Sequence, residues 1–270
     1  MTVDLPAAVV AGEPFQVTVR CAGAGPIAGG VVELVRDTAV THTRRQWAGA
    51  VSAVADRDTA VVARADLDPA GCCRLAVPPG EATIAGHLVQ RDYSVLAWVR
   101  GAAGPGGEGA APVRVLASAP GAAADEAAPE DVNAQGPVVL SFADLPGRTV
   151  RPGTEILGTV TATAREGLAA RGVRVELVLD EHVPARAAEQ VEDERSAVTV
   201  VATVSLSGPI RLTAGESLRW PFRLRAPDPL PAPTTATEEF TVRWLLRAVV
   251  DRAVRTDCVT TVGLRGSTAP

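Results

Sequence analysis

The sequence predicts an all-β protein built from two tandem β-sandwich domains. Three observations lead to this prediction: valine-rich segments that alternate with a period of two, a scarcity of aromatic residues, and an order of segments that occurs twice. Apolar residues make up 47% of the 270 residues but aromatic residues only 3%, so Val, Leu, Ile and Ala must fill the cores. Because β-branched side chains suit a pleated surface and 270 residues exceed the usual size of one domain, two valine-filled sandwiches are expected.

The alternation is clearest in the segment Leu218–Arg225. Its apolar residues share one face of a strand, whereas Arg219, Arg223 and Arg225 fall on the other face. A helix would scatter those apolar residues around its circumference. Residues 198–206 alternate in the same way. Only the segment Pro184–Ala197 has a helical composition, and it is too short and polar for more than a turn or two on the surface.

The sequence contains an internal repeat, in which segments of the first half match segments of the second half. Two matched pairs come first. A glycine turn precedes a strand in Val9–Val19 and again in Val150–Val160. The next segments, Gly30–Val35 and Val173–Val178, share the string Val-Glu-Leu-Val. The same elements therefore follow one another in both halves.

Two further pairs continue the repeat in the same order. Leu75–Pro78 is matched by Leu224–Pro227, and in both segments a strand ends at a proline, which cannot continue a central ladder. Tyr93–Arg100 is matched by Phe240–Arg247, with Tyr93 aligned to Phe240. Two copies of one sandwich explain this order.

The domain boundaries follow from the composition of the segment between the copies. Residues 120–136 are rich in alanine, proline and acidic residues and have no apolar period, as is typical of a linker. We therefore expect an N-terminal sandwich at 1–119, a linker at 120–136 and a C-terminal sandwich at 137–270.

Charge and hydropathy narrow the classes of partner. A net charge of -5 and an isoelectric point near 5.3 argue against binding to nucleic acid or to an anionic membrane. The N-terminus lacks the basic and apolar regions of a signal peptide, and no apolar stretch reaches the length of about 18 residues that predicts a membrane span. We expect no integral membrane segment and a cytoplasmic location.

Cysteine and histidine spacing predicts no metal site and no cofactor. Free, buried thiols are expected at Cys21, Cys72, Cys73 and Cys258. The three histidines are widely spaced, at His42, His87 and His182.

A glycine-rich segment, Gly104–Gly109, has the pattern GxGxxG of dinucleotide-binding loops. Such a loop needs a helix N-terminus after it, and here the strand-like Ala110–Leu116 follows, so the segment is interpreted as a hairpin loop. The segment aligns with a shorter hairpin tip at Val250–Thr256. No nucleophile motif is present, although a Ser-His-Asp arrangement can be neither shown nor excluded from spacing.

Two segments of the second half resemble the arrestin-like superfamily. They are Leu212–Phe222, which reads LTAGESLRWPF, and Glu239–Arg247, which reads EFTVRWLLR. Among its branches, the bacterial sporulation-control proteins are nearest in length and compartment. The resemblance implies two immunoglobulin-like/arrestin-like sandwiches acting as an adaptor or regulator of other proteins. The basic motifs with which animal arrestins contact receptor phosphates are not implied, because they include lysines and this chain has none.

Two groups of residues are candidate contacts. The resemblance implies that a charged cluster could hold the domains together, like the polar core of some arrestins; a solvated hairpin tip would have the same composition. Its residues are Arg247, Asp251, Arg255 and Asp257. The basic stretch Thr41–Trp47 could contact a partner through Arg44, Arg45 and Trp47, because Arg and Trp are favoured at interface centres. A tryptophan that merely caps the end of the sandwich would also fit this stretch.

The leading hypothesis is a non-enzymatic, arrestin-like adaptor or regulator, related to sporulation or stress control, that binds protein partners at a sheet edge or through loops. A ligand-binding sandwich, for instance for carbohydrate, is a second hypothesis, although exposed aromatics are few. An unrecognised hydrolase is a third hypothesis, and a structural shell or filament subunit is a fourth.

Overall fold

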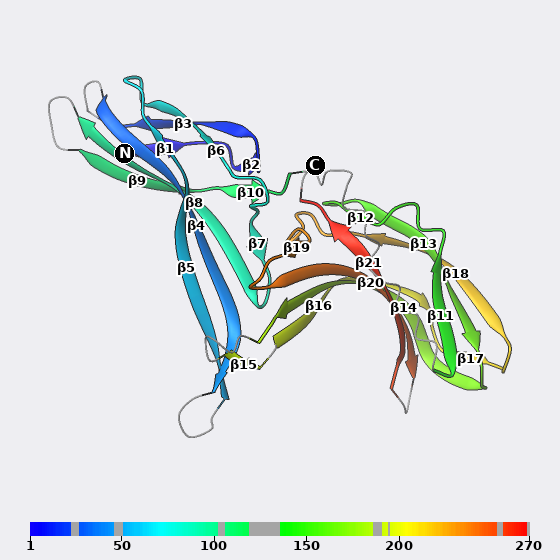
Figure 1. Cartoon of the computed structure of the whole chain (residues 1–270). Helices are drawn as coiled ribbons and strands as arrows, with labels where there is room; N and C mark the ends of the chain where they lie inside the picture. Colours follow the sequence, from blue (N-terminus) through cyan, green and yellow to red (C-terminus); the bar gives the residue numbers. More distant parts are fainter. Residues whose placement is uncertain are drawn as a thin grey trace. The chain divides into compact units, whose positions relative to one another are not determined.

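The structure is a computed structural model that describes residues 1–22, 27–45, 51–101, 106–118, 136–185, 191–193, 195–252 and 256–268. All regular elements in these ranges are strands (Figure 1). None of the described residues belongs to a helix that could cross a membrane. The all-β fold predicted from the sequence is confirmed.

The chain forms two compact units. The N-terminal unit contains the described residues of 1–118 and 183–195, and the C-terminal unit contains those of 136–182 and 196–268. The expected linker lies outside the described residues except for Gly136. The domain boundaries derived from the sequence stay a prediction.

The N-terminal unit consists of a three-stranded sheet, a six-stranded sheet and one parallel pair. The smaller sheet has the order β1-β3-β6, with β1 at Thr2–Asp4, β3 at Pro14–Arg20 and β6 at Cys72–Ala76. The larger sheet contains β4 (Ile27–Arg45), β5 (Val51–Asp66), β7 (Ile84–Ala85), β8 (Val89–Gly101), β9 (Gly107–Pro112) and β15 (Val191–Asp193). The parallel pair is β2 (Ala8–Val10) with β10 (Arg114–Leu116).

The core of this unit lies between the two sheets. Phe15 and Val17 of β3 are buried in one cluster with Leu34 of β4 and with Val95 and Ala97 of β8. Alternate residues of β3 and β8 are buried along the strands, as expected when one face of each sheet meets the other sheet. The unit is therefore a β-sandwich.

The C-terminal unit repeats this plan with a three-stranded and a seven-stranded sheet. The smaller sheet has the order β11-β13-β18, with β11 at Val138–Ala143, β13 at Glu155–Ala164 and β18 at Ser217–Arg225. The larger sheet contains β12 (Thr149–Val150), β14 (Leu168–Val183), β16 (Arg195–Ser207), β17 (Ile210–Leu212), β19 (Thr235–Ala236), β20 (Thr241–Arg252) and β21 (Cys258–Gly266).

Trp244 is the largest fully buried side chain of the C-terminal unit. Its indole Nε1 donates a hydrogen bond to the carbonyl oxygen of Ala232 at 3.0 Å, so its polar atom is satisfied. A Cβ at Gly266 would lie 2.2 Å from the same Nε1, so only glycine fits there. The alternation predicted for Leu218–Arg225 is confirmed, since Phe222 and Leu224 are buried and the arginines are exposed.

The smaller sheets confirm two matches of the repeat: Val9–Val19 with Val150–Val160, and Leu75–Pro78 with Leu224–Pro227. Phe15 faces Leu75 across β3 and β6, and Ile156 faces Leu224 across β13 and β18. The residues matched by sequence are thus cross-strand partners in both units.

The larger sheets show that the match of Tyr93–Arg100 with Phe240–Arg247 is wrong by four residues. Leu34 faces Val95 in the N-terminal unit, whereas its counterpart Leu177 faces Leu246 in the C-terminal unit. The structural counterpart of Tyr93 is therefore Trp244, not Phe240. A shift by four keeps every side chain on the same face of the strand, so alternation alone could not detect it.

The expected helical segment is also corrected. Residues 191–193 form β15, which pairs with Thr43 and Arg44 of β4, and β16 begins at Arg195. Residues 186–190 and 194 lie outside the described residues. Backbone pairing with β4 outweighs the weak helix preference of this short segment.

Candidate functional site

Arg247, which the sequence singled out, lies opposite Glu176 across β20 and β14. Oε2 of Glu176 accepts a hydrogen bond from Nε of Arg247 at 2.6 Å and lies 2.6 Å from Nη2 of the same guanidinium in an ion pair. Oε1 of Glu176 accepts a hydrogen bond from Nε of Arg174 at 2.6 Å. Only 6% of the Glu176 side chain is exposed, so two guanidinium groups enclose one buried carboxylate.

The electrostatics of Glu176 follow from this enclosure. Burial alone would raise its pKa, but the hydrogen bonds from Arg174 and Arg247 and their positive charges outweigh burial and lower the pKa. The carboxylate stays ionised at neutral pH, and both of its oxygens already accept hydrogen bonds. A group of this kind holds strands together and is poorly suited to act as a general base.

The network continues to the tip of the β20–β21 hairpin. Nη1 and Nη2 of Arg174 lie 3.8 Å from Asp251 Oδ2 and Asp257 Oδ2. Nη2 of Arg171 donates to Oδ1 of Asp251 at 2.7 Å, and the backbone N–H of Arg252 donates to Oδ1 of Asp257 at 3.0 Å. We call this network the polar cluster; its members are Arg171, Arg174, Glu176, Arg247, Asp251 and Asp257.

The sequence predicted a charged cluster of four residues, and the structure brings three of them, Arg247, Asp251 and Asp257, into one network. They are connected through residues that the sequence analysis did not single out. Arg255 lies outside the described residues. The missed residues are Arg171, Arg174 and Glu176. The sequence carried part of the signal for two of them, because Arg174 and Glu176 alternate onto the same strand face, but their position beside Arg247 depends on the strand register. The expected part of the cluster in holding the domains together stays a prediction.

The second predicted contact falls mostly outside the described residues. The backbones of Arg44 and Arg45 form the end of β4, and Trp47 is not described. Contact of Arg44, Arg45 and Trp47 with a partner therefore stays a prediction.

A second ionic cluster lies in the N-terminal unit around Glu81. Glu81 accepts a hydrogen bond from Nη1 of Arg36 at 2.9 Å and one from the hydroxyl of Tyr93, and Nη1 of Arg91 lies 3.6 Å away. Burial and the hydrogen bond to Glu81 raise the pKa of Tyr93. These contacts fasten the connection between β6 and β7 onto β4 and β8.

The four cysteines are free. Cys258 is buried as expected, whereas the other three are partly exposed. Burial, with smaller contributions from Cys72 and Asp68, raises the pKa of Cys73 to about 11. Because the thiolate is the reactive form, Cys73 is a poor nucleophile.

The histidines are held in separate places. Nε2 of His42 lies 3.3 Å from Asp56 Oδ2, and Nδ1 of His182 lies 3.3 Å from Ser196 Oγ in an exposed pair. Among the described residues, no three His, Cys, Asp or Glu side chains are grouped so that they could hold a metal ion. The exposed Ser-His pair offers no water-shielded pocket for nucleophilic chemistry.

The last candidate is β16, at one edge of the seven-stranded sheet. Its only ladder neighbour in the described part of the chain is β14. None of its 13 residues is buried, and Val198 and Val200 are 53% and 44% exposed. The sequence predicted the alternation of this strand but not the exposure of its apolar face.

The corresponding edge of the N-terminal unit is β5, which pairs with β4 as β16 pairs with β14. β5 carries five charged residues, whereas Ser196–Ser207 of β16 contains no charge, proline or glycine. Two of the β5 charges form ion pairs, Asp58 with Arg36 and Arg64 with Glu33, and Asp56 lies 3.3 Å from Nε2 of His42. Charges are a common protection of an edge against pairing with another chain, so β5 is protected where β16 is not.

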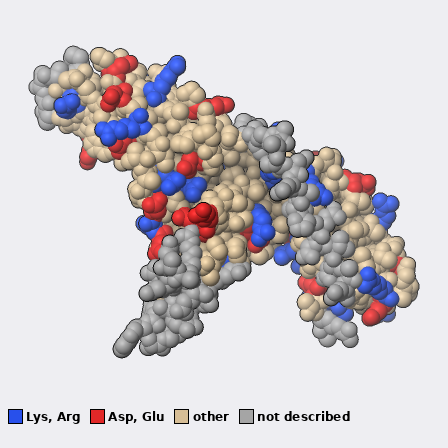
Figure 2. Space-filling view, in the orientation of Figure 1, with Lys and Arg blue, Asp and Glu red and all other residues tan. Residues whose placement is uncertain are grey.

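The surface charge is mixed. On the face shown in Figure 2, acidic and basic side chains of the described residues are interspersed, without a large area of one sign. Such a surface favours local contacts over long-range attraction of a strongly charged partner.

Comparisons with known proteins add a likeness of fold. No protein-family model matches the sequence, and no curated protein matches it. Among solved structures, the crystal structure of the sporulation control protein Spo0M from Bacillus subtilis is similar, with a TM-score of 0.40 and 18% sequence identity. The match covers 50% of this chain and 51% of that chain. At this level the likeness says nothing about function.

Proposed function

We propose that this chain is a non-enzymatic adaptor or regulator that binds protein partners by strand addition at β16. The supporting observation is the unprotected edge: 13 residues without a buried side chain, uncharged from Ser196 to Ser207, with two valines half exposed. An extended segment of a partner gains main-chain hydrogen bonds at such an edge and covers the exposed valines.

The wider biological setting is part of the same proposal. From the sequence resemblance we infer an arrestin-like protein of bacterial origin that works in the cytoplasm, in a process like sporulation or stress control. The partner is a protein rather than a nucleic acid, because the net charge is -5.

The contribution of the exposed valines to the binding free energy can be estimated from their exposure. Burying a valine side chain completely stabilises a complex by about 1.5 kcal/mol, so covering one that is about half exposed contributes roughly 0.8 kcal/mol. A glutamate in its place would also bury a charge against the partner. We expect the variant Val198→Glu to weaken binding at least about tenfold, or about 1.4 kcal/mol.

The test is partner capture from the native cell extract with the full chain, followed by a measured affinity for the captured protein. Val61→Glu is the matched control, because Val61 on β5 is 54% exposed, against 53% for Val198. We expect Val198→Glu to lose the partner and Val61→Glu to keep it. Equal binding by both variants and the unchanged chain, or no specific partner at all, would refute the proposal.

A further inference from the structure

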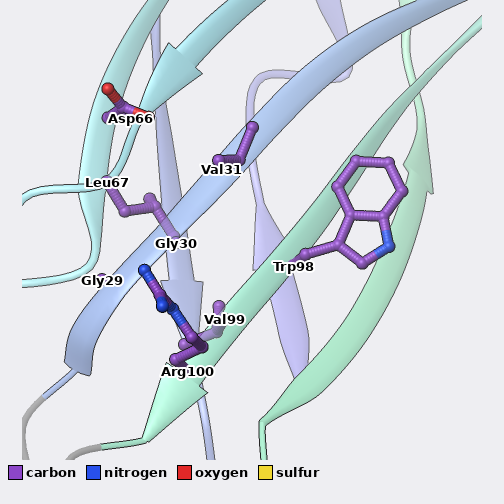
Figure 3. A pocket seen from close by; sticks show the side chains of 8 residues that line it. All are labelled: Gly29, Gly30, Val31, Asp66, Leu67, Trp98, Val99 and Arg100. Atoms are coloured by element: carbon purple, nitrogen blue, oxygen red, sulfur yellow. The ribbon is translucent and has the colours of Figure 1, made fainter.

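A hollow of about 480 Å³ lies on the N-terminal unit where β5 leaves the sheet (Figure 3). It is within the size range of ligand pockets. Its lining comes from β4, β8 and the end of β5: Gly29, Gly30, Val31, Asp66, Leu67, Trp98, Val99 and Arg100. None of these residues belongs to the polar cluster or to the ionic cluster around Glu81.

The hollow exists because one strand ends while its neighbour continues. β5 is paired with β4 as far as Asp66 opposite Val31, and Leu67 N–H then donates to the carbonyl oxygen of Gly30 at 2.9 Å. β4 continues to Ile27, paired only with β8 in the described residues. Within the described part of the chain, one backbone edge of β4 from Ile27 to Gly29 thus has no strand beside it.

Two glycines, Gly29 and Gly30, line the hollow, and each lies close to a neighbouring residue. A Cβ at Gly30 would lie 2.6 Å from the carbonyl oxygen of Trp98 and 2.8 Å from Cδ1 of Leu67, so no side chain fits there. At Gly29 the Cβ would lie 3.9 Å from Nη2 of Arg100. The side chain of Arg100 extends from β8 toward Gly29 on β4, and a Cβ at Gly29 would be in ordinary contact with it (Figure 3).

The charged groups at the hollow have no partner among the described residues. Within that part of the chain, neither Arg100 nor Asp66 makes a hydrogen bond or an ion pair through its side chain. Trp98 is 40% exposed, with Glu108 of β9 as its cross-strand partner on the other side. An arginine whose donors have no partner among the described residues, beside an exposed tryptophan and a backbone edge without a neighbouring strand, is a combination that can recognise a peptide.

The other copy of the sandwich differs at the matching place. The counterpart of Gly30 is Val173, which is buried opposite Val250 as Gly30 lies opposite Val99. The counterpart of Arg100 is Asp251, which is held by Arg171. The charged side chain at the matching place in the C-terminal unit is thus paired, whereas Arg100 has no partner among the described residues.

We propose that the hollow binds an extended peptide segment of a partner protein, with a carboxylate side chain facing Arg100. Gly29 is the cross-strand partner of Arg100, and Val31 is the partner of Trp98 and Asp66. These positions are two residues apart along β4, about 7 Å in a strand. The peptide therefore carries Asp or Glu at one position and, two residues away, an apolar or basic side chain that packs on Trp98 near Asp66.

The first experiment selects peptides on the intact chain from a phage-displayed library of random heptapeptides. We expect the selected pool to be enriched in Asp or Glu at one position, with apolar or basic residues two positions away. A synthetic peptide of the consensus sequence, and its Asn or Gln counterpart, then give affinities by titration. A pool without acidic enrichment would overturn the proposal.

Charge reversal at the arginine is the decisive second step. In Arg100→Glu the same library should select Lys or Arg at the position where acidic residues were selected, and the original peptide should bind at least about tenfold more weakly. The matched control is Arg74→Glu, an exposed arginine on β6 in the other sheet of the unit. Peptide binding that survives Arg100→Glu, or binding of neutral oligosaccharides only, would refute the assignment.

This site is independent of β16, although both proposals have the chain bind proteins. The peptide titration does not involve Val198, and partner capture at β16 does not involve Arg100. A failure of one test therefore leaves the other proposal standing.

Discussion

Replacing Glu176 with glutamine tests how the polar cluster stabilises the C-terminal unit. The substitution keeps the size of the side chain but removes the charge and one of the two carboxylate acceptors between Arg174 and Arg247. Hydrogen bonds to charged groups contribute about 1.5–3 kcal/mol each. The two arginines are 32% and 26% exposed and can be partly rehydrated, so we expect a loss of about 2 kcal/mol at pH 7.

The pH dependence of this loss has a definite sign. Because the folded state lowers the pKa of Glu176, the stabilisation is fully present above the unfolded value of about 4.3. It disappears as the pH falls through the lowered pKa of the folded state. Glutamine does not titrate, so the difference in unfolding free energy between the two proteins should shrink toward zero in acid.

The assay is urea unfolding of the full chain followed by tryptophan fluorescence, at pH 7 and at several acidic values. Glu33→Gln is the matched control, because Glu33 occupies the same place in the repeated Val-Glu-Leu-Val string. Its ion pair with Arg64, at 3.2 Å, involves an arginine that is 64% exposed, so we expect less than about 1 kcal/mol. Equal losses at the two glutamates, or a Glu176→Gln loss that persists unchanged in acid, would refute this reasoning.

Two further predictions concern the N-terminal unit. Gly30→Ala should cost about 1–3 kcal/mol of unfolding free energy, because the added Cβ would meet the Trp98 carbonyl. The control Gly208→Ala should cost much less, because a Cβ at Gly208 would have no atom within 4 Å. Similar urea midpoints for the two variants would contradict this prediction. Cys73, with a pKa of about 11, should react with iodoacetamide at pH 7.5 roughly 300-fold more slowly than an ordinary thiol. Mass spectrometry of the Cys72→Ser variant measures that rate, and alkylation at an ordinary rate would show that the thiol is not shielded.

The all-β fold was predictable because it depends on a coarse property of the chain. Alternation in Leu218–Arg225 and the matched pairs Phe15–Leu75 and Ile156–Leu224 are set by which face of a strand is apolar. The same property explains the error at Tyr93, since a strand shifted by four residues presents the same faces. Only the cross-strand register, which depends on bulges and loop lengths, shows that the structural counterpart of Tyr93 is Trp244.

The candidate site was less predictable because it depends on contacts between segments far apart in the chain. Arg247 and Asp251 were visible as a charged run, but their partners Glu176 and Arg174 lie about 70 residues earlier. Strand pairing that buries Glu176 between two arginines could not be foreseen without the register. The segment that forms β15 was misinterpreted for a related reason, because its structure comes from pairing with β4.

The two copies of the sandwich differ in the places that each leaves open. The N-terminal copy protects its edge strand β5 with charges but leaves a hollow beside Arg100, whose side chain has no partner among the described residues. The C-terminal copy pairs Asp251, the counterpart of Arg100, with Arg171, but leaves its own edge strand β16 without charge from Ser196 to Ser207. Since the opposite copy pairs the charge at the one place and carries charges at the other, neither the unpaired arginine nor the uncharged edge is required for folding. Stability alone does not account for these differences between copies, and this is the physical ground for assigning binding to both places.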